Sequence, residues 1–308
     1  MRIVLTGYAH PRYAASLKEF GTPRPLPRSG GWLLERAIDG TALRDAMGCY
    51  PLFACADWSQ LHLDLEDSTD GLVSLSAVTD PFGDYTEDYL RRCFPDVVLP
   101  FKEHFVTELG AKPLPAFVSK HHRYYARKAS EQVRVERCDN PAQFVDEWTT
   151  LYGALVERHA LKGIKAFSRR SFAAQLDVPG IVMFRAVAAD TTVGAHLWYV
   201  QNDVAYSHLA ASNALGYELM AAYALYWFAL EYFAEQRIGW LDVGAGAGLG
   251  GDDAGLTRFK RGWSTASRTV YFCGRIFDRQ KYAEATQAKG VVAADTRYFP
   301  AYRQGEFG

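Results

Sequence analysis

Apolar and polar positions alternate in some stretches of the chain and recur every three or four residues in others, and this spacing predicts strands and helices respectively. In the N-terminal third, segments rich in proline and glycine separate short elements. We expect two strands and one helix there, at 50–58, 71–80 and 86–94. A stretch with two prolines and no periodicity, 108–117, marks the expected boundary between an N-terminal domain (1–115) and a C-terminal domain (116–308).

The remaining two thirds of the chain have a more regular pattern. The predicted elements are a basic helix (119–129), a strand (133–138), two helices (140–158, 168–176), three strands joined by tight turns (181–189, 193–200, 204–211), a long buried helix (215–236), a strand (238–243), a short helix or turn (255–263) and a last strand (268–277). Three successive strands joined by tight turns form an antiparallel meander. This order predicts an α+β (mixed α/β) fold rather than alternating βαβ units.

Composition narrows the class of protein. The chain has 308 residues, of which 49% are hydrophobic and 22% charged, so it can bury the core of two globular domains. A net charge of −1 gives no broad electrostatic case for binding DNA. Its five cysteines lack the spacing of a zinc site, so we expect no metal and reduced thiols in the cytoplasm. The longest apolar stretch, 219–234, contains Glu231 and is shorter than the ~20 residues of a membrane span.

The segment WLDVGAGAGLGG (240–251) raises the question of a nucleotide-binding loop. A strand that runs into alternating glycines is typical of such loops, including those of S-adenosylmethionine-dependent methyltransferases. That interpretation requires parallel strands upstream and a helix that begins at the loop. Here the upstream strands form a meander, and the residues after Gly248 have no apolar helical face. The methyltransferase therefore stays a minor alternative, and a surface loop that only uses the conformational freedom of glycine is another.

Two motifs resemble a known family. The sequence GLTRFKRGW (255–263) resembles the G-L-x-x-F-K-x-x-[FW] signature that follows a glycine-rich loop in FemABX-like proteins of the GNAT acyltransferase superfamily. The sequence SKHHRYYARKA (119–129) resembles the basic helix that opens the second half of those proteins. The resemblance covers residues 119–275. It implies a GNAT-like fold with two halves, of which the N-terminal one is degenerate, and N-acyltransferase activity.

The resemblance also implies where an acyl donor binds. In GNAT enzymes the pyrophosphate of acyl-CoA, commonly acetyl-CoA, lies at the start of the long helix, where backbone N–H groups favour an anion. The corresponding donor-site residues are Ser212, Asn213, Leu215, Gly216 and Tyr217. Gly216 fits the family's [QR]-x-x-G-x-[GA] loop, whereas Asn213 departs from it. Aminoacyl-tRNA stays open as a donor, although the helical arm of tRNA-using peptidyltransferases has no counterpart here.

Three residues are candidates for catalysis. Lys260, in the FK pair of the motif, is placed by the resemblance in the substrate site, where its ammonium group can meet a phosphate or a developing oxyanion; a lysine taken alone is more often solvated. His208 can accept a proton from an attacking amine near neutral pH, or be a hydrogen-bonded core residue. Asp242 ends a strand and either orients the amine, pairs with Lys260 or caps the glycine loop.

The acceptor is expected to meet a second group of residues. Arg123 and Arg127 lie on one helical face and form an anion site between the domains, unless the helix is simply solvated. Tyr206, on the strand face of His208, and Phe259 complete the predicted substrate site. We expect a cytoplasmic N-acyltransferase that modifies an amine of a small molecule or of a peptidoglycan or polysaccharide precursor. A GNAT-fold protein that binds a ligand without turnover is the alternative from another class.

The glycines have a role in this interpretation. They let the backbone approach the substrate and present the FK segment. Substitution of Gly244 or Gly246 by valine is therefore predicted to abolish activity with little loss of folding.

Overall fold

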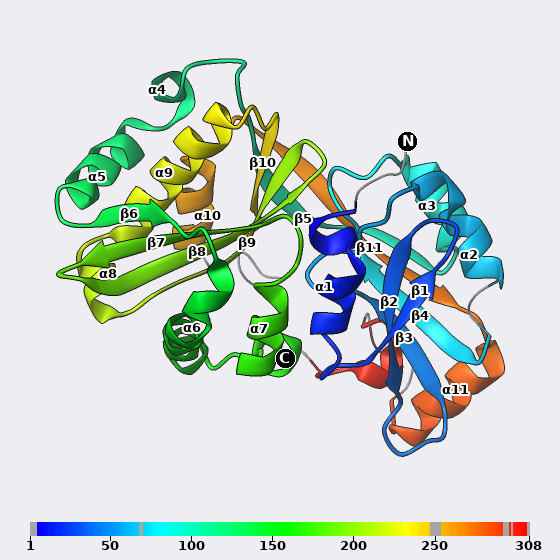
Figure 1. Ribbon diagram of the computed structural model, residues 1–308. Helices are drawn as coiled ribbons and strands as arrows, with labels where there is room; N and C mark the ends of the chain where they lie inside the picture. Colours follow the sequence, from blue (N-terminus) through cyan, green and yellow to red (C-terminus); the bar gives the residue numbers. More distant parts are fainter. Residues whose placement is uncertain (1–4, 68–69, 247–253, 292–295, 297, 307–308) are drawn as a thin grey trace. The chain divides into compact units, whose positions relative to one another are not determined.

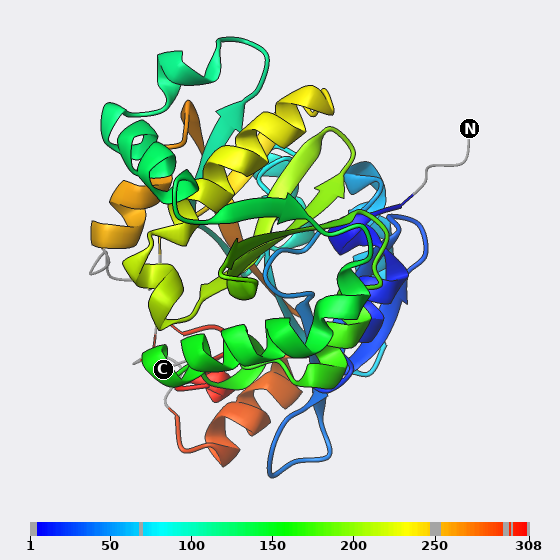
Figure 2. The same cartoon turned by 60° about the vertical axis from the view of Figure 1, so that its left-hand side comes forward.

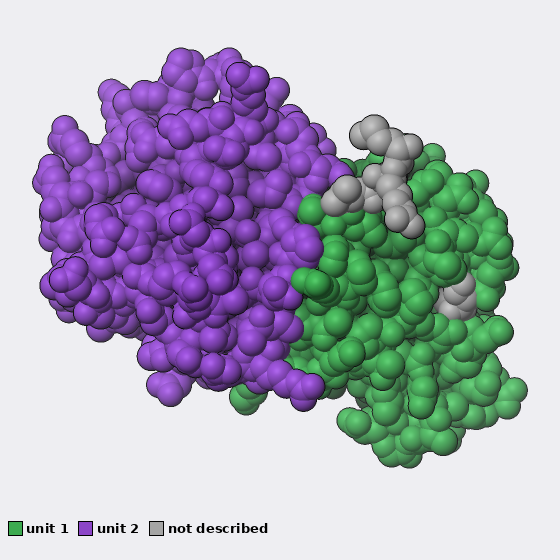
Figure 3. Space-filling model, in the orientation of Figure 1, with its two compact units in different colours: residues 1–101, 162–165, 270–308 green, residues 102–161, 166–269 purple. Residues whose placement is uncertain are grey.

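The structure is a computed structural model that describes residues 5–67, 70–246, 254–291, 296 and 298–306. Packing divides the chain into two compact units (Figure 3), unit 1 with residues 1–101, 162–165 and 270–308 and unit 2 with residues 102–161 and 166–269. The domain boundary that the sequence pattern predicts near residue 115 stays a prediction. All the predicted site residues belong to unit 2.

Unit 1 contains the strand order β1-β2-β3-β4-β11 (Figure 1). Its strands are β1 (Thr22–Leu26), β2 (Gly31–Ala37), β3 (Arg44–Gly48), β4 (Leu72–Val78) and β11 (Ala266–Ile276), the last of which begins in unit 2. The first three strands are antiparallel neighbours, β3 and β4 are parallel, and β4 and β11 are antiparallel. The sequence pattern predicted β4 and missed β1 to β3. Proline occurs twice in β1, which is an edge strand, the position in a sheet where proline is tolerated.

The helices of unit 1 are α1 (Pro11–Ser16), α2 (Leu61–Asp67), α3 (Glu87–Cys93) and α11 (Arg279–Ala288). Residues of α2 and α3 share one apolar cluster with the strands, while Ala285 of α11 packs with Val73 and Tyr302 in a second one. The predicted helix at 86–94 is confirmed as α3. The predicted strand at 50–58 is wrong, because its only pairing among the described residues is a single bridge from Phe53 to Thr79.

Unit 2 contains the strand order β5-β10-β9-β8-β7-β6. The strands are β5 (Val97–Glu108, which begins in unit 1), β6 (Arg134–Arg137), β7 (Ile181–Ala188), β8 (Thr191–Gln201), β9 (Val204–Ser212) and β10 (Trp240–Gly244). The predicted meander is confirmed as β7-β8-β9, and Asn202 has the expected positive φ of 53° in its second turn. Strand β10 is parallel to β9 and antiparallel to β5. The pattern did not predict β5.

Helices cover both faces of this sheet (Figures 1 and 2). The helices are α4 (Leu114–Phe117), α5 (Lys120–Ser130), α6 (Val145–His159), α7 (Arg169–Gln175), α8 (Ala214–Glu218), α9 (Ala221–Glu235) and α10 (Ala254–Arg261). Helices α5 and α9 lie on one face, and α6 and α7 lie on the other. Helix α9 forms the centre of the main core cluster. The single long helix predicted at 215–236 is wrong, because Met220, with a φ of 56°, separates α8 from α9.

The two units repeat one strand pattern. In each, two antiparallel pairings lead to a parallel pair, β3/β4 in unit 1 and β9/β10 in unit 2, with helical residues between its strands. In each unit one further strand pairs antiparallel with the second strand of the parallel pair, β11 with β4 in unit 1 and β5 with β10 in unit 2. The prediction of an α+β fold with two similar halves is confirmed. The methyltransferase alternative is wrong, since it needs alternating parallel strands around residue 244.

Candidate active site

The parallel strands β9 and β10 of unit 2 pair over only a short length. The paired residues are Trp240 with Val204, Leu241 with Ala205 and Asp242 with Tyr206. Strand β9 continues to Ser212. Among the described residues, its part beyond Tyr206 pairs only with β8. The two strands therefore separate after Asp242. An opening of this kind exposes backbone groups of β9 on the side of β10.

Lys260 lies at this opening. Its Nζ donates a hydrogen bond of 2.7 Å to the carbonyl oxygen of Ala245, just after β10. Burial lowers the pKa of Lys260 to about 8; the Asp242 carboxylate opposes this shift and Lys102 adds to it. Because an ordinary lysine has a pKa near ~10.4, the environment of this ammonium group is strongly desolvated. The prediction that Lys260 reaches the site from α10 agrees with this geometry, while its catalytic role stays a prediction.

Asp242 holds a histidine that the sequence analysis did not single out. Strand β5 carries His104, whose Nδ1 lies 2.8 and 3.0 Å from the two carboxylate oxygens of Asp242. Asp242 also accepts a hydrogen bond of 2.8 Å from the backbone N–H of Gly244. The capping role suggested for Asp242 thus has a structural basis, and its carboxylate acts electrostatically on Lys260. Its orientation of a substrate amine stays a prediction. The local pattern gave no signal for His104, because residues 102–104 are polar in succession and β5 was not recognised as a strand.

A second polar network lies on the face of the sheet that α9 covers. His196 of β8 shares a hydrogen bond of 2.8 Å with the Ser207 hydroxyl, which lies 3.4 Å from the hydroxyl of Tyr226 in α9. The pKa of His196 is well below its usual value because of burial, with Lys260 and His208 acting in the same direction, so its imidazole is neutral. Burial raises the pKa of Tyr226 to about 12. Nδ1 of His196 and Nε1 of Trp263 are buried and have no hydrogen-bond partner within the described residues.

His208 lies away from this network. Strand β9 bulges at His208, because Ser207 pairs with Trp198 and Leu209 with Leu197. The bulge lets Nε2 of His208 hydrogen-bond the Oε1 of Gln175 in α7 at 3.0 Å. Burial lowers the pKa of His208 to about 3, which makes it a weak base at neutral pH. Its predicted role as the base stays a prediction, and a competing group is available in His104.

The predicted donor site contains the short helix α8. The Asn213 side chain accepts the backbone N–H of Gly216 at 2.8 Å, as expected for a cap. A Cβ at Gly216 would lie 2.1 Å from the carbonyl oxygen of Val193, so this glycine is required for packing against β8. Leu215 and Tyr217 are exposed, and Ser212 is buried at the end of β9. These five residues do lie together, and their contact with a donor stays a prediction.

The predicted acceptor residues lie in α5, α10 and β9. In α5, Arg127 is exposed and Arg123 is partly buried, with an Nε that has no hydrogen-bond partner within the described part of the chain. Their neighbour His122 is buried and connects α5 to α10: it shares hydrogen bonds with the Ser119 hydroxyl and the Phe259 carbonyl oxygen, at 2.6 and 2.8 Å.

The two aromatic residues of that prediction lie on opposite faces of the sheet. The Phe259 ring packs in the α9-side cluster, against Tyr223 and Tyr226. Tyr206 is buried beside Asp242 on the opposite face, since its neighbour Ala205 belongs to that cluster. Binding of substrate by these residues stays a prediction.

The described part of the glycine segment constrains Lys260 directly. Gly244 has a φ of +81°, which favours glycine, and a Cβ there would lie 2.8 Å from the Lys260 Nζ. A Cβ at Gly246 would lie 2.5 Å from the Thr257 hydroxyl oxygen. The expectation that valine at Gly244 leaves folding nearly unchanged therefore needs correction, since a positive φ strains any β-branched residue. The predicted substrate approach at 247–251 lies outside the described residues.

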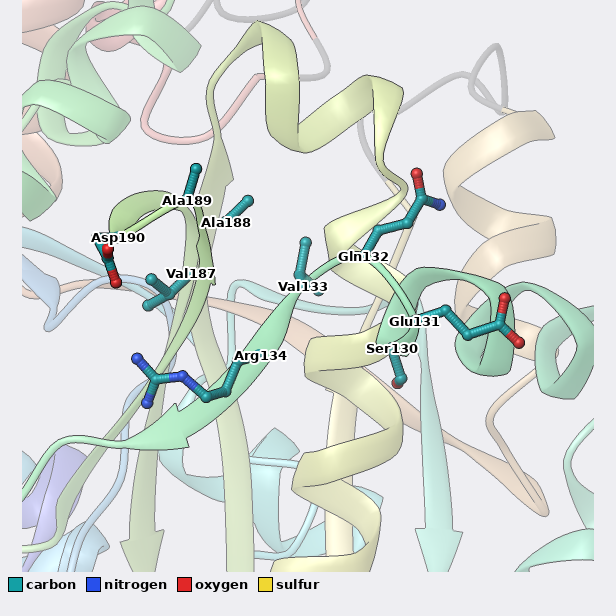
Figure 4. Close-up of a pocket in the computed structure, with 9 residues that line it drawn as sticks. All are labelled: Ser130, Glu131, Gln132, Val133, Arg134, Val187, Ala188, Ala189 and Asp190. Atoms are coloured by element: carbon teal, nitrogen blue, oxygen red, sulfur yellow. The ribbon is translucent and has the colours of Figure 1, made fainter.

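An open hollow on unit 2 does not coincide with this site (Figure 4). It lies between the α5–β6 connection and the end of β7, and Figure 4 shows Arg134 and Asp190 on one side of it and Glu131 on the other. No predicted site residue lines it. Over the residues that the structure describes, no group of three or more histidine, cysteine or acidic side chains could hold a metal ion. In the same part of the chain, no helix is long and apolar enough to cross a membrane.

Comparison with known proteins identifies the fold. Residues 116–261 match the family model of the acetyltransferase (GNAT) domain. The structure resembles that of FemX with a TM-score of 0.66 and 14% sequence identity, covering 89% of this chain and 93% of FemX. It also resembles the C-terminal domain of a lysylphosphatidylglycerol synthetase from Agrobacterium fabrum (TM-score 0.60, 12% identity, 90% of each chain) and L-PGS from Bacillus licheniformis (TM-score 0.54, 13% identity, 93% of this chain and 96% of that one).

A search of curated proteins gave no match. The family match and the structural neighbours agree with the motifs at 119–129 and 255–263, and the resemblance drawn from them is confirmed. Residues 116–261 are thus similar to the acetyltransferase (GNAT) domain, and the fold of the chain as a whole resembles that of FemX.

Proposed function

We propose that this protein is an N-acyltransferase that moves an acyl or aminoacyl group from an activated donor to an amine. The observation that carries the proposal is the position of Lys260. Its ammonium group is held by the Ala245 carbonyl oxygen, where β9 and β10 separate in a GNAT domain. A fixed cation in a desolvated site stabilises the oxyanion of a tetrahedral intermediate far better than a solvated one. A lysine with only a surface role would not be expected to lie there.

The open strand supports the binding of an elongated donor. The residues of β9 beyond Tyr206 present one edge of backbone, and an extended chain can hydrogen-bond such an edge. We propose acyl-CoA, with acetyl-CoA first, as the donor, and aminoacyl-tRNA as the other class. The residues around Asn213 and the exposed Leu215 and Tyr217 are the proposed donor contacts. Arg123 and Arg127 are proposed to bind an anionic group of the acceptor.

The acceptor is proposed to be an amine of a small molecule or of a cell-wall precursor. The similarity to FemX and to the C-terminal domain of a lysylphosphatidylglycerol synthetase supports a small-molecule or precursor substrate. Amine nucleophiles must be neutral to attack, so a base near the opening is required.

The test is direct transfer. Purified protein is incubated with isotope-labelled acetyl-CoA, longer acyl-CoAs or aminoacyl-tRNA, together with a panel of amines that includes amino sugars and precursor peptides, and products are identified by mass spectrometry. We expect amide formation with one donor class and its loss in Lys260→Met. Thermal stabilisation checks binding separately, because a ligand at 100 times its Kd adds ~2.7 kcal/mol. Stabilisation by a donor without any transfer would instead support the ligand-binding alternative.

A further inference from the structure

The pair formed by His104 and Asp242 joins two neighbouring strands of unit 2. Asp242 of β10 is opposite Val106 of β5, and His104 lies two residues from Val106 on the same face of that strand. Both carboxylate oxygens lie within 3.0 Å of Nδ1 of His104. The contact therefore joins two strands that are also hydrogen-bonded through their backbones, so the sheet fixes the positions of both residues.

This contact fixes the tautomer of the histidine. A carboxylate oxygen only accepts hydrogen bonds, so Nδ1 carries the proton and donates it to Asp242. In the neutral imidazole, Nε2 then has the free lone pair, as a base requires. The side chain of Asp242 is 3% exposed and that of His104 is 13% exposed. Of the two side chains, the imidazole is therefore the more exposed.

The same carboxylate also organises the lysine. Asp242 accepts a hydrogen bond of 2.8 Å from the backbone N–H of Gly244. The carbonyl oxygen of the following residue, Ala245, accepts a hydrogen bond of 2.7 Å from Lys260. His104 is thus hydrogen-bonded to Asp242, Asp242 to the turn at Gly244, and the same turn, through Ala245, to Lys260. A substitution at Asp242 would disturb both the base and the cation.

We propose that His104 is the general base of the transfer reaction and that Asp242 is its positioning residue. The proposal rests on the proposed function and adds the group that removes the proton. The amine nitrogen attacks the carbonyl carbon of the acyl thioester or aminoacyl ester, and the N–C bond forms. Nε2 of His104 takes the proton that the nitrogen loses. The C–S or C–O bond to the donor then breaks, and that proton passes to the departing sulfur or oxygen.

Two other histidines of this sheet are less suited to this task. His208 is buried and its Nε2 is bonded to Gln175, while His196 is bonded to Ser207 beneath α9. Asp242, the partner of His104, is paired with Tyr206 of β9 and acts electrostatically on Lys260 of α10, which Lys102 of β5 also influences. Asp242 is the one of these four that holds the imidazole by a hydrogen bond.

The experiment compares His104→Ala, His104→Gln and Asp242→Asn with wild type in the transfer assay. His159→Ala, an exposed histidine at the end of α6, is the matched control. We expect kcat to fall by about 10²- to 10⁴-fold in both His104 variants, as for loss of a general base, with KM changed less than about threefold. Added imidazole should restore activity to His104→Ala in proportion to its concentration and leave His104→Gln unchanged.

The outcomes separate the two proposals. If wild type transfers an acyl group and His104→Ala keeps most of its kcat, the base assignment is overturned and the proposed function stands. If wild type transfers none to any acceptor, both are overturned. Nitrogen-15 NMR of labelled wild-type protein adds a test that needs no variant: a proton on Nε2 of His104 instead of Nδ1 would overturn the assignment. Loss of kcat with imidazole rescue and a proton on Nδ1 would establish it.

Discussion

The two halves of the molecule build the same parallel strand pair and complete it differently. In unit 1 the pairing of β3 and β4 continues beyond β3, because Phe53 bridges to Thr79 at the end of β4. The backbone N–H of Phe53 donates to the Val78 carbonyl oxygen at 2.7 Å, and the Asp80 N–H donates to that of Phe53 at 3.1 Å. The equivalent region of unit 2 lacks this continuation among described residues, since β9 and β10 stop pairing at Asp242 and Tyr206.

The side chains at the two strand ends differ in the same way. In unit 1 the Phe53 ring packs edge-on against Trp58, and both are buried. In unit 2 the corresponding opening has the ammonium group of Lys260 and the carboxylate of Asp242, with His104 beside it. Burial of charged groups costs free energy that an aromatic filling avoids. Unit 2, which buries the charged groups, is the unit expected to catalyse the reaction. The prediction of a degenerate first half then means that unit 1 has apolar residues where unit 2 has charged ones.

The largest effect is expected from removal of the cation. Lys260→Met keeps the length and apolar part of the side chain but loses the charge that would meet the oxyanion. We expect kcat to fall by about 10²- to 10³-fold, the range found for loss of one oxyanion-stabilising group. The matched control is Arg258→Met, an exposed cation two residues earlier in α10. Equal activity in Lys260→Met and the control would remove the functional distinction between the two halves.

A smaller effect is expected from the turn that holds the cation. Gly244 and Gly71 share a φ of +81°, but a Cβ at Gly244 meets the Lys260 Nζ at 2.8 Å, whereas one at Gly71 has nothing within 4 Å. Gly244→Ala and Gly71→Ala should therefore each lose about 1 kcal/mol of unfolding free energy from backbone strain. Only Gly244→Ala should also lose activity, by about 10-fold or more, because Lys260 is displaced. Urea unfolding and the transfer assay measure the two effects, and equal activity in both variants would refute the link.

A substitution beside the β3/β4 pair of unit 1 should lower stability rather than activity. Phe53→Leu removes part of a buried ring while keeping an apolar side chain. We expect a loss of about 1 kcal/mol in the free energy of unfolding and little change in kcat, since cores tolerate apolar replacements at this cost. Chemical denaturation and the transfer assay check the prediction. A large loss of kcat at unchanged stability would show that the first half takes part in catalysis.

The sequence predicted those parts of the fold that have a periodic pattern or a motif. Alternation was enough for the β7-β8-β9 meander, and the FK motif led to Lys260. Strand β5 was missed because it contains Pro100 and has polar residues in succession at 102–104 instead of an alternating pattern, so His104 was missed with it. A pairing across 138 residues, such as that of His104 with Asp242, leaves no local signal.

The conformation around the site was also hidden from the pattern. The break at Met220 places a non-glycine residue at positive φ inside an apolar run that otherwise indicates one helix. The hydrogen bond between His208 and Gln175 of α7 joins residues 33 apart in the sequence, so no local pattern could indicate it. The first is a tertiary effect that overrides a local preference, and the second is a tertiary contact. The GNAT architecture was readable from the sequence, whereas the identity of the partner groups around Asp242 required coordinates.

The last expected effect is a change in the pH dependence of transfer. Burial lowers the pKa of Lys260 to about 8, so its charged fraction falls as the pH rises through this value. Because the proposed role needs the ammonium form, kcat should decline above pH 8, approaching tenfold per pH unit well above the pKa. Lys260→Arg retains a charge whose pKa exceeds ~12, so its lower rate should show no such decline. The ratio of the wild-type rate to the Lys260→Arg rate cancels the titration of the substrate amine and of every other group that the two proteins share. A ratio that rises with pH above 8 would mean that neutral Lys260 acts as the base, and the cation would then no longer distinguish unit 2 from unit 1.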